Sequence, residues 1–137
     1  MINPINHGRT PAEIATYKVE PYVLAGDVYA VQPHQGHGGW TWYTGSAGWL
    51  NQLITDHFFG LRKEGSTLSF VPCVPIEWGS FKIHYKYKSS IYHISFIQNP
   101  EVGEMHVKEN NIDIPEKKIT LVDDGMSHVV DIVIYRG

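Results

Sequence analysis

Residues 81–97 read FKIHYKYKSSIYHISFI and predict a β-hairpin. Apolar and aromatic side chains alternate with Lys and His through the first eight positions, which is the period of a half-buried strand. Ser89 and Ser90 can turn the chain into a second strand over residues 91–97. Four further strands are expected, each marked by apolar alternation or bounded by turn residues: 67–70, 104–108, 117–121 and 129–135. Six short strands separated by turn signals favour a β-sandwich.

The N-terminal part of the chain carries helix signals instead. Thr10-Pro11-Ala12-Glu13 combines a Thr N-cap, Pro at the first helical position and a Glu placed to close a capping box. Pro21 disfavours helical geometry at the residue before it, so a break is expected there and a fresh helix over residues 22–29. Apolar residues then recur at three- and four-residue spacing and predict an amphipathic helix over residues 45–59.

The two kinds of signal meet at Arg62-Lys63-Glu64-Gly65-Ser66, which is typical of a turn. We therefore expect an α+β chain with helices in residues 1–63 and strands in residues 64–137. Three helices cannot close a core of their own, so the helical part is expected to pack on the sandwich edge or against a segment upstream of residue 1. Asp123-Asp124-Gly125 predicts a turn before the last strand.

Composition excludes several classes of function. Apolar residues make up 42% and charged residues 18% of the chain, as in globular proteins. The net charge is -3 and no run of basic residues occurs, which argues against nucleic-acid binding. No apolar stretch reaches the ~18 residues of a membrane span. Cys73 is the sole cysteine, which excludes a disulfide framework and a cysteine-based zinc site. The first residues show no secretory leader, which favours the cytoplasm.

Residues 38–49, GGWTWYTGSAGW, carry the densest chemical signal. Thr44 lies at the expected start of a helix, where free backbone N–H groups and the helix dipole favour an anion such as phosphate. The glycines allow close approach, and aromatic side chains such as Trp42 can stack on sugar faces. The alternative is that Thr44 only caps the helix while the tryptophans pack in a core.

Histidines and carboxylates give weaker signals. His34 and His37 are three residues apart in a glycine-rich loop without a third ligand at zinc-like spacing, so no metal site is predicted. The four histidines of the strand region fall one per strand and are interpreted as surface residues. Glu20 and Asp27 are seven residues apart, which on a continuous helix would put both on one face. Capping by Glu20 and simple solvation of Asp27 remain the alternatives.

Several motifs together resemble the C-terminal end of glycoside hydrolase family 94, formerly glycosyltransferase family 36. They are residues 19–23 (VEPYV), 38–49, 60–62 (GLR), 72–75 (PCVP) and Trp78. Within that family, residues 3–7 (NPINH) and 39–45 are most similar to cyclic β-1,2-glucan synthases and β-1,2-oligoglucan phosphorylases. The resemblance covers nearly the whole chain. It implies that residues 1–63 are the last helices of an (α/α)6 barrel and residues 64–137 a jelly-roll-like antiparallel β-sandwich.

The resemblance also implies a reaction. In the family, inorganic phosphate attacks the anomeric carbon of a β-linked gluco-oligosaccharide while an aspartic acid protonates the leaving oxygen, giving α-glucose 1-phosphate without a cofactor. A Thr-Gly pair that holds phosphate in the family matches Thr44 and Gly45. A sugar-contacting glutamine of cellobiose-type members is replaced by Gly26, so the resemblance implies sugar contact for Asp27 beside it, and for Glu20.

The family's catalytic aspartate, and the arginine and histidine that bind phosphate, lie upstream and are absent here; His7 falls in a different motif. Loss of a general acid costs a factor of about 100 to 10,000, so the isolated chain is expected to be inactive. It would need the upstream barrel segment or a companion chain as partner. The alternative function is a non-catalytic carbohydrate-binding or interaction module.

Overall fold

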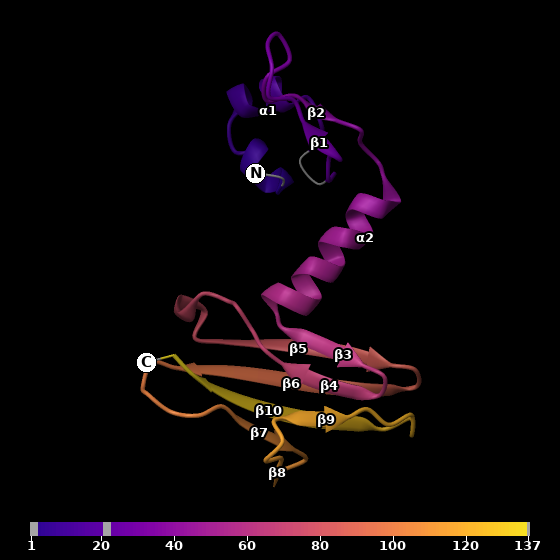
Figure 1. The fold of residues 1–137 in the computed structure, drawn as a ribbon, viewed down its shortest axis with the longest axis vertical. Helices are drawn as coiled ribbons and strands as arrows, with labels where there is room; N and C mark the ends of the chain where they lie inside the picture. Colours follow the sequence, from indigo (N-terminus) through magenta and orange to yellow (C-terminus); the bar gives the residue numbers. More distant parts are fainter. Residues whose placement is uncertain (1–2, 21–22, 137) are drawn as a thin grey trace. The chain divides into compact units, whose positions relative to one another are not determined.

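A computed structural model describes residues 3–20 and 23–136 of the chain. The chain forms two compact units, Met1–Gln52 and Leu53–Gly137 (Figure 1). The described residues form a few short helices and three β-sheets, which confirms the α+β class. This division falls between residues 52 and 53, whereas the family boundary expected at 63/64 stays a prediction.

The second unit holds a five-stranded sheet of order β5-β6-β10-β7-β8 and a three-stranded sheet of order β3-β4-β9. The five strands of the larger sheet are β5 (Ser80–Tyr87), β6 (Ser90–Asn99), β7 (His106–Glu109), β8 (Ile112–Asp113) and β10 (Ser127–Tyr135). Those of the smaller sheet are β3 (Leu61–Glu64), β4 (Thr67–Phe70) and β9 (Lys118–Thr120). A short 3-10 helix, Ile76–Trp78, precedes β5.

The predicted hairpin is confirmed. β5 and β6 pair antiparallel with Ile83 opposite Ile94, and the turn lies at Lys88 and Ser89. Along β5 half-buried and exposed residues alternate strictly, as the apolar and polar pattern predicts. The other four predicted strands correspond to β4, β7, β9 and β10 within two residues at each end.

Side chains from both sheets of the second unit pack into one core. Phe70 of β4 meets Phe96 of β6 edge-on, and Phe81 of β5 stacks on Phe96 with ring centroids 4.5 Å apart. Alternate residues of β4, β6 and β10 enter this core, so each of the two sheets buries one face.

One strand pair departs from the antiparallel arrangement that the resemblance implies. β10 runs parallel to β6 over nine residues, from the Ser127–Ile91 pair to the Tyr135–Asn99 pair. Parallel neighbours need a long connection, and here the chain passes through β7, β8 and β9 before it returns beside β6. The expectation of a purely antiparallel sheet is therefore wrong at this pair.

In the first unit, α1 (Pro11–Tyr17) begins as predicted. The Thr10 side chain accepts a hydrogen bond from the Glu13 backbone N–H, and the Glu13 carboxylate accepts one from the Thr10 N–H, so the capping box is complete. A short 3-10 helix, Pro4–His7, precedes it. The core of this unit is small, formed by Tyr17, Val19, Val23 and Ala25.

The helix expected over residues 22–29 is wrong for its described part, since residues 21 and 22 lie outside the described residues. Residues 23–26 are loop and bend, and β1 (Asp27–Val28) pairs antiparallel with β2 (Gly38–Gly39). In a helix these backbone N–H groups would donate within the helix. Here they donate to the facing segment instead, and the Tyr29 N–H donates to the His37 carbonyl at 2.9 Å. Tertiary pairing thus outweighs the local preference that the proline pattern indicated.

The helix expected over residues 45–59 is present as α2 (Thr44–Gln52), continued by the π-helical segment η2 (Leu53–Phe58). Gly60 follows with φ +68°, a left-handed conformation that suits glycine at a helix end. The expected turn over residues 62–66 is partly wrong, because residues 62–64 belong to β3 and only Gly65 and Ser66 form the turn. Within the part of the chain described, every helix is too short or too polar to cross a bilayer.

Candidate functional site

The N-terminus of α2 carries the residues that sequence reasoning selected for an anion. The Ala47 N–H donates to the Tyr43 carbonyl at 3.3 Å, so Tyr43 occupies the N-cap position and Thr44 is the first helical residue. The interpretation of Thr44 as the capping residue is therefore wrong. Backbone N–H groups of the first helical positions have no partner within the helix, so Thr44, Gly45 and Ser46 present donors outward.

A hollow of about 310 Å³ lies at this helix end. It is lined by Val23, Leu24, Trp42, Tyr43, Thr44 and Ala47. A Cβ atom added to Gly45 would meet no atom within 4 Å, so the helix end beside the hollow is open. The structure thus brings Thr44 and Trp42 together around one space, with Gly45 next to it in sequence.

The tryptophans of this segment are exposed and do not form a core. Trp40, Trp42 and Trp49 keep 66%, 68% and 76% of their surface accessible, so the expectation that they pack inside is wrong. Trp40 and Trp42 also have positive φ angles of 50° and 63°. Left-handed backbone at a bulky residue costs about 1–3 kcal/mol, and such strain is enriched at turns and functional sites.

The two carboxylates predicted to contact sugar do not line this hollow. Asp27 lies on β1 opposite Gly39, where its carboxylate occupies the space that a Cβ on Gly39 would need. Glu20 is exposed, and its backbone carbonyl accepts the Val23 N–H at 3.0 Å. Their placement on one helix face is wrong because residues 23–27 are not helical.

The surface interpretation holds for His84 and His93 but not for His128. His84 and His93 come from neighbouring strands and contact each other. His128, expected at the surface, is buried and stacks on Tyr92 with ring centroids 4.4 Å apart. His34 and His37 have ring centroids 6.3 Å apart. Among residues 3–20 and 23–136 no three His, Cys, Asp or Glu side chains gather as a metal cluster.

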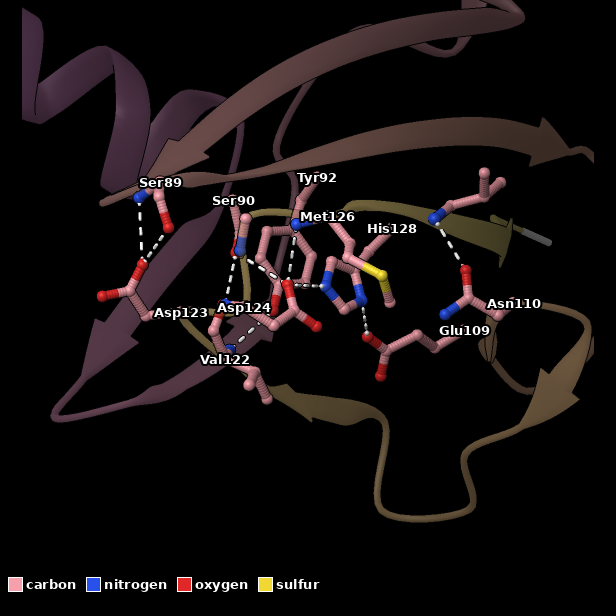
Figure 2. A network of polar contacts seen from close by, with 12 residues as sticks. Ser89, Ser90, Tyr92, Glu109, Asn110, Val122, Asp123, Asp124, Met126 and His128 are labelled. Atoms are coloured by element: carbon pink, nitrogen blue, oxygen red, sulfur yellow. Dashed lines mark hydrogen bonds and ion pairs between the residues drawn. The ribbon is translucent and has the colours of Figure 1, made fainter.

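A polar network around the turn before β10 was missed by sequence reasoning (Figure 2). His128 lies between two carboxylates, with Nε2 3.2 Å from Asp124 and Nδ1 3.3 Å from Glu109. Asp124 also accepts hydrogen bonds from the Met126 backbone N–H and the Ser90 hydroxyl. The Met126 N–H, His128 and Ser90 together lower the pKa of Asp124 to about 2.

This network holds a turn and does not form a catalytic set. Asp124 separates Ser90 from His128, whereas an activated serine needs the histidine as its direct partner. The signal in the sequence was the Asp-Asp-Gly turn, but its partner Ser90 lies 34 residues earlier in the chain.

Comparison with known proteins points to the same family as the motifs around the N-terminus of α2. Residues 1–60 match the model of the glycosyl hydrolase 94 superfamily, catalytic domain. The chain is 39% identical over 111 residues to the cyclic β-(1,2)-glucan synthase of Rhizobium meliloti (strain 1021), covering 81% of this chain and 4% of that protein. It is 31% identical over 91 residues to the N,N'-diacetylchitobiose phosphorylase of Vibrio proteolyticus, covering 65% of this chain and 11% of that protein.

A third relative, the solabiose phosphorylase of Paenibacillus borealis, is 25% identical over 117 residues, which is 82% of this chain and 15% of that protein. The chain therefore spans only a small part of each of these relatives. Their names describe phosphorylases and a glucan synthase, which fits the motif order of residues 19–78. The chain belongs to the glycosyl hydrolase 94 superfamily.

Proposed function

We propose that this chain is the C-terminal part of an inverting β-glucan phosphorylase, or of the corresponding module of a cyclic β-1,2-glucan synthase, and that Thr44 and Gly45 bind phosphate in it. The observation that carries this proposal is the open N-terminus of α2 beside a hollow lined by Thr44 and Trp42. It lies within the residues that match the family's catalytic domain. A hydroxyl and free backbone N–H groups at a helix N-terminus are suited to an anion.

The reaction follows from the inverting mechanism. Phosphate would attack the anomeric carbon of a β-linked gluco-oligosaccharide from the face opposite the leaving oxygen, while a carboxylic acid donates a proton to that oxygen. The product is α-glucose 1-phosphate, and no cofactor takes part. Trp42, exposed beside Thr44, is suited to stack on a sugar face.

Among the described residues that line the hollow, none carries a cationic side chain. Phosphate binding would therefore need charged groups from an upstream segment, which would also supply the acid. We assign residues 1–63 to the end of an (α/α)6 barrel and residues 64–137 to a jelly-roll-like β-sandwich. The exposed tryptophans support this assignment, because a barrel segment would cover apolar surface that the chain alone leaves open.

The test of Thr44 uses the complete enzyme with Thr44→Val, which keeps the shape and removes the hydroxyl. A hydrogen bond to a charged group contributes about 1.5–3 kcal/mol, so phosphate should bind roughly 10- to 150-fold more weakly. Thr120→Val, on an exposed position of β9, is the control and should leave phosphate binding unchanged. Equal phosphate affinity in the wild type and Thr44→Val would exclude the role of Thr44.

A second experiment separates this proposal from the carbohydrate-binding alternative. The isolated chain should release no glucose 1-phosphate from β-gluco-oligosaccharides, and activity should return when the upstream segment is supplied. Saturable oligosaccharide binding by residues 64–137 alone would instead favour the non-catalytic module.

A further inference from the structure

His84 and His93 face each other across β5 and β6. The two residues are direct partners in the antiparallel register, and their Nδ1 atoms lie 2.7 Å apart. The rings are nearly perpendicular, with centroids 4.9 Å apart and an interplanar angle of 80°. His84 is exposed and His93 half-buried, so the pair is open to solvent.

The contact shows that the two Nδ1 atoms face each other. A hydrogen bond between two imidazoles requires one Nδ1 to carry the proton and the other to present its lone pair. If both rings carry their proton on Nε2, two lone pairs face each other across this contact, and ring rotations can turn both toward one cation. Directly opposed residues of an antiparallel pair have their Cβ atoms about 4.5–5.5 Å apart, which holds the rings together without strain.

We propose that His84 and His93 form a two-imidazole site for a late first-row transition metal ion: Cu²⁺, Ni²⁺ or Zn²⁺. Imidazole nitrogens bind such ions at about 2.0–2.1 Å, so two nitrogens on one ion are roughly 2.9 Å apart at a right angle and 3.4 Å apart in a tetrahedron. The present separation of 2.7 Å has to widen by about 0.2 Å for a right angle and by about 0.7 Å for a tetrahedron, which rotations of the two side chains provide. Water completes the coordination.

Neighbouring charges on the same face set the strength of this site. Lys82 and Lys86 flank His84 along β5, and Asp131 of β10 is paired with Ser95, two residues beyond His93. The lysines oppose a cation, while the aspartate favours one. A two-ligand site in this setting binds weakly and follows the general order of metal affinity, with Cu²⁺ above Ni²⁺ and Zn²⁺.

The test uses the full chain labelled with ¹⁵N and Cu²⁺ added below one equivalent. Paramagnetic broadening should first remove the amide signals of residues 83–85 and 92–94. His93→Gln should abolish this selective broadening, and His106→Gln, an exposed histidine on β7 of the same sheet, should leave it intact. Broadening that begins elsewhere, or that persists unchanged in His93→Gln, overturns the proposal.

A second measurement does not depend on NMR signals at the pair. Zn²⁺ should raise the melting temperature of the wild type and of His106→Gln, because an ion that binds only the folded state stabilises it. His84→Gln changes an exposed side chain, and its amide spectrum will report whether it folds. A melting temperature that rises equally in folded His84→Gln and in the wild type refutes the site.

Discussion

Ser90→Ala removes the hydroxyl around which the turn before β10 is built. Ser90 is fully buried, and its Oγ accepts the N–H groups of Asp124 at 3.0 Å and Gly125 at 3.1 Å. The same hydroxyl donates to the Asp124 carboxylate at 2.9 Å. Alanine therefore leaves two backbone donors and one carboxylate oxygen without this partner (Figure 2).

The size of the effect follows from these three bonds. A neutral hydrogen bond contributes about 0.5–1.5 kcal/mol net, and one to a charged group about 1.5–3 kcal/mol. Asp124 and Gly125 are exposed, so water recovers part of the loss. We expect unfolding free energy to fall by about 2–3 kcal/mol, which corresponds to a melting temperature roughly 10–20 °C lower for a domain of this size.

Ser89→Ala is the matched control at the adjacent position. Ser89 is exposed, and its hydroxyl and backbone N–H both donate to the exposed carboxylate of Asp123. A surface substitution of this kind changes stability by about 0.5 kcal/mol. Urea unfolding followed by circular dichroism measures both variants, with the slope against urea expected to be unchanged. A difference between Ser90→Ala and Ser89→Ala of less than about 0.5 kcal/mol would refute the reasoning.

Three further predictions concern acid, a glycine and association. The pKa of Asp124 is lowered in the folded state, so its contribution to stability is present above pH 4 and is lost as pH falls toward 2. In Asp124→Asn, the unfolding free energy should therefore fall less steeply between pH 4 and pH 2 than in the wild type. The same fall in both proteins would contradict this role of Asp124. Gly60→Ala should lower the unfolding free energy measured with urea by more than about 1 kcal/mol, because φ is +68° and the added Cβ would overlap the backbone of Val71. Wild-type stability in Gly60→Ala would show that the chain at this turn can rearrange. Exposed aromatic residues in 40–49 should make the isolated chain associate as concentration rises, and a monomer at all concentrations in light scattering would count against a missing covering segment.

Local patterns in the sequence predicted what depends on near neighbours. The alternation in residues 81–87 determines which face of β5 is buried, and the capping box of Thr10 and Glu13 determines where α1 begins. The helix of residues 44–58 followed from apolar spacing in the same way. Each of these features rests on contacts between residues a few positions apart, which composition and spacing record directly.

Pairings between distant segments could not be predicted. The strand β1 depends on β2, whose residues lie at least ten positions further along the chain. The parallel pairing of β10 with β6 depends on the path through three intervening strands. The contacts of His128 come from Glu109 on β7 and from Asp124 before β10, which are 15 residues apart in the chain. No local period encodes these contacts.

For the candidate site, the sequence by itself determined the family and the segment, because the motif order of residues 19–78 and the glycine-rich stretch before α2 are written in the chain. Only the tertiary structure decided that Tyr43 is the N-cap, that Thr44 and Trp42 share one hollow, and that Glu20 and Asp27 lie outside its lining. It also decided that His84 and His93 meet. The physical reason is that a side chain's neighbours are set by strand register and core packing, which bring together residues that no spacing rule connects.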